Sequence, residues 1–363
     1  MTTAPAIRFE AARKEYPGSV AVDDLTLDVH EHELLVLVGP SGCGKSTTLR
    51  MVNRLVEPTS GRILVGGEDI TTVDPVLLRR RIGYVIQGVG LFPHRTVAQN
   101  VATVARLTGW DRRRTADRVE HLLALVGLDP ARYARRYPHE LSGGERQRVG
   151  VARALATDPP VLLMDEPFGA VDPVGRARLQ AEFSRLHDEL GTTVMMVTHD
   201  VDEAVRMADR VVVLSAGAHV EQVDGPLQVV AAPATPVVAE LVGRGRVARL
   251  LALGTLERAD LTPGGDTVPR ASGGAQRPPE GATGRPPVSS VALGAGLDEV
   301  LEALTTAASP TAGGPAGDPA GLAEGAGVDV VDGGVVVGRA GAATVLRALR
   351  RLGASVEVGT LPG

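Results

Sequence analysis

The chain of 363 residues has one cysteine, two lysines, nine aromatic residues and no long hydrophobic run. A single cysteine excludes a disulfide framework and a cysteine-based metal cluster, which suits a reducing compartment. No stretch approaches the roughly 18–20 apolar residues that a membrane span needs. The N-terminal segment contains acidic residues and lacks the apolar run of a secretory signal. A net charge of −5 argues against nucleic acid as the main partner. We therefore expect a cytosolic protein that can still dock on a membrane partner.

The few aromatic residues are unevenly placed. All nine lie in the first 183 residues, and the 180 residues from Ser184 to Gly363 contain none. Because aromatic side chains supply much of the buried area of ordinary cores, the C-terminal half must pack with smaller aliphatic residues or pack loosely. The two lysines are Lys14 and Lys45, against 36 arginines.

Short apolar runs alternate with helical patterns over the first two thirds of the chain. The runs that read as buried strands are 33–38, 161–166, 192–200 and 211–214, and the segments with helical spacing include 143–157 and 174–190. Continuous apolar strands separated by helices predict an α/β fold with a parallel sheet covered on both faces. The segment before about residue 80 is richer in strand and turn signals and predicts an antiparallel lobe, whereas 97–136 predicts a helical subdomain.

The composition changes after about residue 243. Glycine and proline make up 23 of the 70 residues in 261–330, which passes the level typical of low-complexity or disordered sequence. Structure-like pieces flank or interrupt this stretch, at 246–259, 288–307 and 328–359. We therefore predict one domain over 1–243 and a small, doubtful C-terminal region over 244–363.

The first motif with clear chemistry is the run GPSGCGKS, from Gly39 to Ser46. It follows a predicted strand and opens a predicted helix, which is the context that a phosphate-binding P-loop requires. Glycines let successive backbone N–H groups point at phosphate oxygens, and the helix N-terminus adds its positive end. Lys45 is expected to reach the β- and γ-phosphates and Ser46 to ligate Mg²⁺. Half of the lysines of the chain thus stand where this motif needs one.

The second motif is VLLMDEP, from Val161 to Pro167. Four apolar residues followed by two acids place Asp165 at the C-terminal edge of a parallel sheet, where ligands bind in this architecture. We expect Asp165 to hold Mg²⁺ and Glu166 to take a proton from an attacking water as a general base.

The third motif is LSGGERQ, from Leu141 to Gln147. Ser142 can cap a helix, and the amides of Gly143 and Gly144 are free to meet an anion. Taken alone, the motif is equally consistent with an ordinary capped helix.

LSGGERQ lies about 95 residues after the P-loop and some 20 before LLMDEP, and in this order the motifs resemble the nucleotide-binding subunit of an ABC transporter. The resemblance covers roughly residues 6–243. Other family elements fall in sequence: Tyr16 at the adenine-stacking position, Gln87 in the Q-loop, Asp172 in the D-loop and His199 after a strand. GAVD replaces the more usual leucine before Asp172.

The resemblance implies ATP and Mg²⁺ as ligands and assigns roles to individual residues. Its catalytic residues are Glu166, His199 and Gln87, and its Mg²⁺ ligands are Ser46, Gln87 and Asp165. Its ATP-binding residues are Tyr16, Gly39, Ser41, Gly42, Cys43, Gly44, Lys45, Ser46, Thr47, Ser142, Gly143, Gly144 and Asp172. It also implies a head-to-tail pair of copies, with ATP between one P-loop and the partner's LSGG segment, and an associated membrane permease.

The segments 51–70 and 82–100 resemble importers of glycine betaine, choline, carnitine or proline-type osmoprotectants. This narrower resemblance implies an ATPase that works at the cytoplasmic face of the membrane, with a substrate-binding protein acting through the permease. It also implies a C-terminal region with CBS modules, and 288–307 and 328–359 have the order of one degenerate module; a disordered tail is the alternative. Two other functions stay open: an importer for another small solute, such as an amino acid or sulfonate, and a soluble ABC ATPase outside transport.

Overall fold

The computed structural model describes residues 5–169, 171, 173–243, 245–261, 290–308, 328–333 and 335–352. The chain divides into two compact units. The first comprises Met1–Val229 and Pro233–Val242, and the second comprises Val230–Ala232 and Gly243–Gly363. The division falls close to the change in composition at residue 243. None of the described helices is both long enough and apolar enough to cross a bilayer.

The first unit contains an antiparallel sheet in the order β2-β1-β4-β5. Its strands are β1 (Ile7–Tyr16), β2 (Ser19–Val29), β4 (Ser60–Val65) and β5 (Glu68–Asp69). Along β1 the residues Ile7 and Phe9 are buried and their neighbours partly exposed, as expected for a sheet with one face against the core. The predicted antiparallel lobe is present here.

A second sheet in this unit has the order β10-β9-β3-β8-β7-β6. Its strands are β3 (Leu34–Val38), β6 (Ile82–Val85), β7 (Val161–Asp165), β8 (Thr193–Val197), β9 (Arg210–Ser215) and β10 (His219–Asp224). All neighbouring pairs are parallel except β9 and β10. Every residue of β3, β7 and β8 is buried, because each strand has a partner on both sides and helices over its faces.

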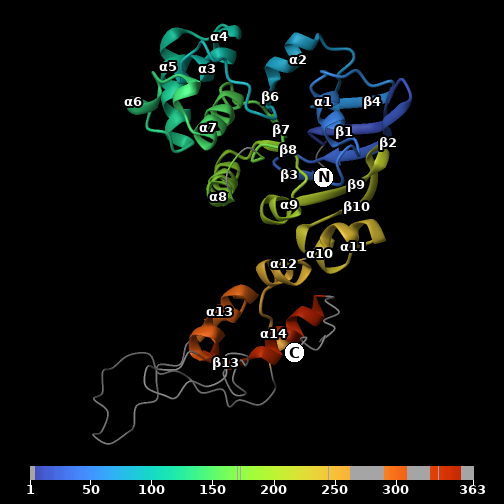
Figure 1. Ribbon diagram of the computed structural model, residues 1–363, viewed down its shortest axis with the longest axis vertical. Helices are drawn as coiled ribbons and strands as arrows, with labels where there is room; N and C mark the ends of the chain where they lie inside the picture. The colour runs from blue at the N-terminus through green and yellow to red at the C-terminus, as the bar shows by residue number, and fades with distance from the viewer. Residues whose placement is uncertain are drawn as a thin grey trace, which may run out of the picture. The chain divides into compact units, whose positions relative to one another are not determined.

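Helices connect and cover these strands. They are α1 (Lys45–Val52), α2 (Pro75–Arg81), α3 (Val97–Val101), α4 (Thr103–Leu107), α5 (Arg112–Leu125), α6 (Pro130–Tyr133), η1 (Pro138–Glu140), α7 (Gly143–Ala154), α8 (Pro173–Leu190), α9 (Val201–Met207), η2 (Ala216–Ala218), α10 (Pro226–Ala231) and α11 (Pro236–Val242). Figure 1 shows α3 to α7 gathered in a lobe beside the sheets, which is the predicted helical subdomain. Buried aliphatic residues from both sheets and α1 form one continuous core.

Arginine side chains fasten several loops of the first unit by donating to backbone carbonyls. Arg54, which follows α1 and has φ +48°, donates to the carbonyls of Ile70 (3.0 Å) and Val73 (2.6 Å). Arg153 on α7 donates to the carbonyls of Gly90 (2.7 Å) and Val89 (2.8 Å). A planar guanidinium presents several donors at once, so one arginine can hold two carbonyls of a loop.

The second unit is built from smaller pieces. They are α12 (Arg246–Leu253), η3 (Arg258–Asp260), β11 (Ser290–Ala292), α13 (Leu297–Ala308), β12 (Val328–Asp332), β13 (Val335–Ala340) and α14 (Ala342–Arg351). Among the described residues the strands form a sheet in the order β11-β12-β13, with the first pair parallel and the second antiparallel. The order strand, helix, strand, strand, helix is the one predicted for 288–307 and 328–359. The final strand expected near 353–359 lies outside the described residues.

The side chain of Asp260 anchors α14 of this unit. Its Oδ1 accepts a hydrogen bond from Arg351 Nε (3.0 Å), and its Oδ2 accepts one from Arg351 Nη2 (2.8 Å). The N–H of Glu257 also donates to Oδ2 (2.9 Å), and Arg347 donates to the Asp260 carbonyl (2.7 Å). Asp260 is only 2% exposed, so this buried carboxylate has the partners that burial requires.

Candidate active site

Four neighbouring strands of the parallel sheet deliver the candidate residues to one edge. In the order β3, β8, β7 and β6, their C-terminal ends lead to the glycine-rich loop, His199, Glu166 and Gln87. Because the carboxyl ends of parallel strands lie on the same edge of a sheet, residues far apart in the sequence meet there.

The glycine-rich loop curls tightly between β3 and α1. Gly44, the residue before α1, has φ +111°, and a Cβ there would lie 2.2 Å from the carbonyl oxygen of Ala21. Only glycine fits such a position. Lys45 is 6% exposed, and its Nζ donates to the carbonyls of Gly39 (2.7 Å) and Pro40 (2.8 Å). The loop is thus folded around its lysine, with the free amides of the α1 N-terminus beside it.

Ser46 and Asp165 form a pair of oxygen groups at the start of α1. The hydroxyl of Ser46 donates to Oδ1 of Asp165 (2.9 Å), while Arg50 Nη2 lies 3.5 Å from Oδ2. Asp165 is 1% exposed. A hydroxyl and a carboxylate are hard oxygen ligands of the kind that Mg²⁺ prefers, usually with phosphate oxygens and waters completing its shell. The residues therefore fit Mg²⁺ bound together with a phosphate group. Among the described residues, no cluster of three or more His, Cys, Asp or Glu offers an all-protein metal site.

Glu166 is the point where the three expected catalytic residues meet. Its Oε2 accepts a hydrogen bond from Gln87 Nε2 (3.1 Å), and its Oε1 lies 3.2 Å from His199 Nδ1. The backbone of Glu166 has φ +45°, which is uncommon for a residue with a side chain and typical of functional sites. Its N–H bonds to the carbonyl of Val197 on β8 (3.0 Å). The carboxylate is thereby aimed at the same edge as the glycine-rich loop.

The LSGG segment begins α7 with a complete capping box. Ser142 Oγ accepts from the Glu145 N–H (3.2 Å), and Glu145 Oε2 accepts from the Ser142 N–H (2.7 Å). The Tyr133 hydroxyl donates to Glu145 Oε1 (2.6 Å); this bond, with the Ser142 N–H, lowers the pKa of Glu145. Ser142, Gly143 and Gly144 line a cavity of about 600 Å³ that does not include the P-loop. The segment thus caps α7 and also lines a cavity with Gly143 and Gly144, so capping a helix and binding an anion do not exclude one another here.

Two further predicted residues lie apart from this cluster. Tyr16 ends β1 with 39% exposure, and the ammonium of Lys14 lies 5.0 Å from its ring centroid, so its ring is accessible to a planar ligand. Asp172 falls outside the described residues.

The sequence did not single out Arg50 or Arg176. Arg50 stands four residues after Ser46, one helical turn along α1, and this spacing was the only local signal of its proximity to Asp165. Arg176 contacts Asp200 and Glu203, which lie on a different element, and no pattern within α8 indicates that contact.

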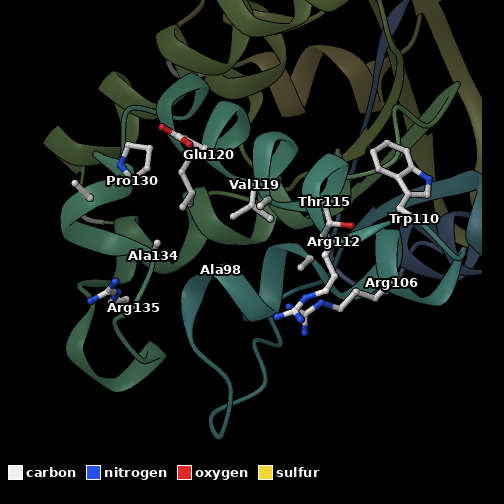
Figure 2. A pocket seen from close by; sticks show the side chains of 14 residues that line it. Ala98, Arg106, Trp110, Arg112, Thr115, Val119, Glu120, Pro130, Ala134 and Arg135 are labelled. Atoms are coloured by element: carbon white, nitrogen blue, oxygen red, sulfur yellow. The ribbon is translucent and has the colours of Figure 1, made fainter.

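A separate cavity of about 760 Å³ lies in the helical lobe. Small side chains such as Ala98 and Ala134 form part of its wall, and Arg106, Arg112 and Arg135 also line it. Figure 2 shows Arg106 and Arg112 directing their guanidinium groups toward the same region. In the part of the chain that the structure describes, none of these three arginines forms an ion pair. Glu120 also lines the cavity, which therefore has three arginines, one carboxylate and a partly apolar wall.

Comparisons with known proteins identify the same family as the motifs do. The family model described as ABC transporter matches residues 22–169. The chain is 50% identical over 242 residues to the glycine betaine/carnitine/choline transport ATP-binding protein OpuCA of Bacillus subtilis, covering 66% of this chain and 63% of that protein. It is 51% identical over 262 residues to the glycine betaine uptake system ATP-binding protein YehX of Escherichia coli, covering 70% and 84%.

A solved structure gives the same result for the fold. A dimeric post-hydrolysis state of an ATP-binding cassette, bound to ADP and Pi, matches with a TM-score of 0.56 and 31% identity, over 61% of this chain and 98% of that one. The match confirms the predicted P-loop α/β fold. The aligned part of the chain spans slightly less than two thirds of OpuCA.

Proposed function

The chain belongs to the ATP-binding proteins of ABC transporters, and from this we propose that it is the ATP-hydrolysing subunit of an importer for quaternary-amine osmoprotectants. The observation that supports ATP hydrolysis most strongly is the convergence of Gln87, Glu166 and His199 beside the loop that holds Lys45. The solute class is supported by two relatives: OpuCA is a glycine betaine, carnitine and choline transport protein, and YehX belongs to a glycine betaine uptake system.

We propose that the nucleotide is ATP and that it binds with its phosphates on the P-loop. The free amides at the start of α1 would donate to phosphate oxygens, and the ammonium of Lys45 would exchange its present carbonyl partners for phosphate oxygens. Tyr16 would stack on the adenine, since its ring is accessible. Ser46, Asp165 and Gln87 would hold Mg²⁺, which when bound would neutralise phosphate charge.

Glu166 would then act as the general base. Its carboxylate takes a proton from the attacking water, and the Gln87 amide and His199 ring orient that carboxylate through the bonds already present. His199 would also hydrogen-bond the γ-phosphate. Electrostatic stabilisation by Lys45 and by donors at the γ-phosphate supplies the rest of the catalysis.

We further propose that two copies pair head to tail. Ser142, Gly143 and Gly144 lie in a cavity apart from the P-loop of their own copy, so their amides would complete the ATP site of the second copy, and Asp172 would cross the interface. The dimeric cassette bound to ADP and Pi supports this arrangement. The ATPase would dock on the cytoplasmic side of the membrane permease, and a substrate-binding protein would act through that permease. The arginines of the cavity in the helical lobe (Figure 2) support a permease segment that carries carboxylates as the docking partner.

The second unit we propose to be a degenerate CBS-like regulatory region. Its order β11–α13–β12–β13–α14 supports this proposal. A second candidate solute class rests on another relative: the chain is 45% identical over 258 residues to the sulfate/thiosulfate import ATP-binding protein CysA of Xanthomonas campestris. Because the ATP-binding subunit does not contact the solute, its active site does not distinguish the two solute classes. A transport measurement does.

The experiment compares the purified full chain with Lys45→Ala and Glu166→Gln. We expect Lys45→Ala to lose binding of a fluorescent ATP analogue, and Glu166→Gln to bind ATP, to hydrolyse it about 100-fold or more slowly, and to form an ATP-dependent dimer. Undiminished hydrolysis by Glu166→Gln would remove the general-base role. Co-purification with a polytopic membrane protein supports transport; co-purification with ribosomes instead contradicts it. Uptake of choline or glycine betaine by the reconstituted complex, but not of sulfate, identifies the solute class.

A further inference from the structure

An arginine of α8 joins that helix to the segment that carries His199. Arg176 Nη2 donates to the carbonyl of Val171 (3.3 Å), its Nη1 donates to Asp200 Oδ2 (3.4 Å), and its Nε lies 4.0 Å from Glu203 Oε1. Each of its three nitrogens thus faces a different residue. The side chain is 29% exposed and that of Glu203 5%, so these contacts are partly shielded from water and more effective than surface ion pairs.

The segment from Thr198 to Glu203 is itself folded around His199. The Thr198 hydroxyl donates to Glu203 Oε2 (2.6 Å) and accepts from the Asp200 N–H (3.0 Å). His199 stands between these two anchored residues, with its Nδ1 3.2 Å from Glu166 Oε1. Its ring is 61% exposed, so little packing holds the ring and its backbone anchors set its position.

The charges around this segment need a cation. Burial raises the pKa of Glu203, and the nearby Asp200 charge acts in the same direction, while the Thr198 hydroxyl, the charge of Arg176 and, least, that of His199 act against them. Without the guanidinium, Asp200 and Glu203 would lose the cation that contacts both of them, and the repulsion between two nearby negative charges would disfavour the present arrangement.

We propose that Arg176 is a positioning residue that fixes His199 against Glu166 and ties that position to the start of α8. The inference rests on the proposed ATPase function. Arg176 also donates to the carbonyl of Val171, the residue immediately before Asp172, which we propose to cross the dimer interface. A displacement of Val171 is therefore passed through Arg176 to the segment that carries His199. Formation of the ATP site between two copies is thereby linked to the position of the histidine.

The test is a functional double-mutant cycle on the full chain, under single-turnover conditions. Arg176→Met removes the charge and the donors but keeps a long side chain. We expect its hydrolysis rate constant to fall about 10- to 100-fold, as for a small misplacement of a catalytic group, with affinity for a fluorescent ATP analogue within about threefold of wild type. Arg176→Lys, which keeps the charge but not the planar fork, should recover part of the rate.

The decisive comparison is with His199→Ala. If Arg176 acts through His199, the double variant Arg176→Met/His199→Ala hydrolyses ATP within about twofold of His199→Ala alone, because the function of the arginine is already lost. Rate losses that multiply in the double variant would overturn the proposal, as would a wild-type rate in Arg176→Met. The matched control is Arg185→Met on the same helix. The Arg185 side chain is 71% exposed and, among the described residues, pairs with Glu189 alone, so this variant should keep the wild-type rate.

A second variant covers the case in which Arg176→Met does not fold. Asp200→Asn keeps an oxygen for the Asp202 N–H, which caps α9, but removes the nearer of the two negative partners of Arg176. We expect its rate constant to fall about three- to tenfold; an unchanged rate counts against the inference. Absence of any ATPase in the wild-type chain refutes the proposed function and the inference together, whereas an active wild type with an unaffected Arg176→Met refutes the inference alone.

Discussion

Replacing Asp260 by asparagine tests whether the second unit has a firm interior despite its lack of aromatic residues. Asp260 receives two hydrogen bonds from Arg351 and one from the Glu257 N–H. Asparagine has almost the same shape and keeps one oxygen acceptor, but it loses the negative charge and one acceptor toward Arg351. The variant therefore removes the charged clamp between η3 and α14 with little change in volume.

The magnitude follows from the number and kind of these bonds. A hydrogen bond to a charged group contributes about 1.5–3 kcal/mol. Arg351 keeps other partners, the Glu257 carboxylate (2.6 Å) and the Thr255 carbonyl (2.9 Å), so the loss stays near the value of one such bond. Since 1.4 kcal/mol corresponds to a factor of ten in an equilibrium constant, local opening of α14 should become about 10- to 100-fold more frequent.

Hydrogen exchange measured by mass spectrometry on peptides from α14 gives this opening equilibrium directly. The matched control is Asp332→Asn. Asp332 also accepts from an arginine, Arg258, at 2.9 Å, but the two side chains are 64% and 51% exposed. Exposed pairs contribute little, so this control should change the exchange of its peptide less than about twofold. Equal exchange in Asp260→Asn and wild type at neutral pH would refute the reasoning.

The pH dependence gives a second check on the same clamp. Burial acts to raise the pKa of Asp260, but the hydrogen bonds from Arg351 and the Glu257 N–H, with the charges of Arg351 and Arg347, outweigh burial and lower that pKa overall. Because the pKa of Asp260 is lower in the folded state, its ionised carboxylate stabilises the folded state at pH values above the unfolded-state pKa of about 3.9. This stabilisation is lost as pH falls through the lower pKa of the folded state. The difference between wild type and Asp260→Asn should therefore stay constant from pH 7 to 5.5 and shrink below about pH 4.

Three further predictions concern the first unit. Tyr16→Ala should weaken ATP binding about tenfold and Tyr16→Phe should not, since stacking needs only the ring; equal affinity of the alanine variant for a fluorescent ATP analogue contradicts the stacking role. Gly83→Ala should lower the free energy of unfolding by about 1–3 kcal/mol, because its Cβ would lie 2.6 Å from the Ala154 carbonyl oxygen; an unshifted urea midpoint would show that the site has room. Tyr133→Phe should raise the pKa of Glu145, because the Tyr133 hydroxyl is the largest cause of its lowered value. As pH falls, the variant should therefore lose the stabilisation that ionised Glu145 provides at a higher pH than the wild type does. Carbon NMR titration of Glu145 measures this change, and an unmoved titration contradicts it.

The sequence predicted the parts of the site that depend on local pattern. The apolar runs predicted β3, β7 and β9 to within one residue at each end, whereas the run 192–200 extended three residues beyond the end of β8 at Val197. The glycines around Lys45 indicated the loop because its backbone angles need them. The sequence predicts a helix that opens at the P-loop and continues through Leu55, but α1 ends at Val52, since Arg54 turns into the left-handed region to reach the carbonyls of the loop before α2.

Contacts across long sequence separations could not be predicted in the same way. Arg176 and Asp200 are 24 residues apart, and Asp260 and Arg351 are 91 apart. Neither helix carries a periodic signal for such a partner, because one arginine among 36 looks like any other on a solvated face. The resemblance assigned Gln87 and His199 to catalysis, but only the structure places both on the carboxylate of Glu166.

The arginines that fasten loops to carbonyls bear on how the protein responds to ionic strength. Salt screens attraction between exposed charges, with a Debye length of about 8 Å at physiological concentration and less above it. The hydrogen bonds from Arg153 and Arg54 to loop carbonyls join a cation to a neutral group. Those to Val89, Ile70 and Val73 are also partly shielded from solvent. Concentrated salt therefore weakens the surface ion pairs of this chain more than it weakens these loop anchors. The loop that follows Gln87 therefore keeps its attachment to α7 at salt concentrations that weaken the surface ion pairs.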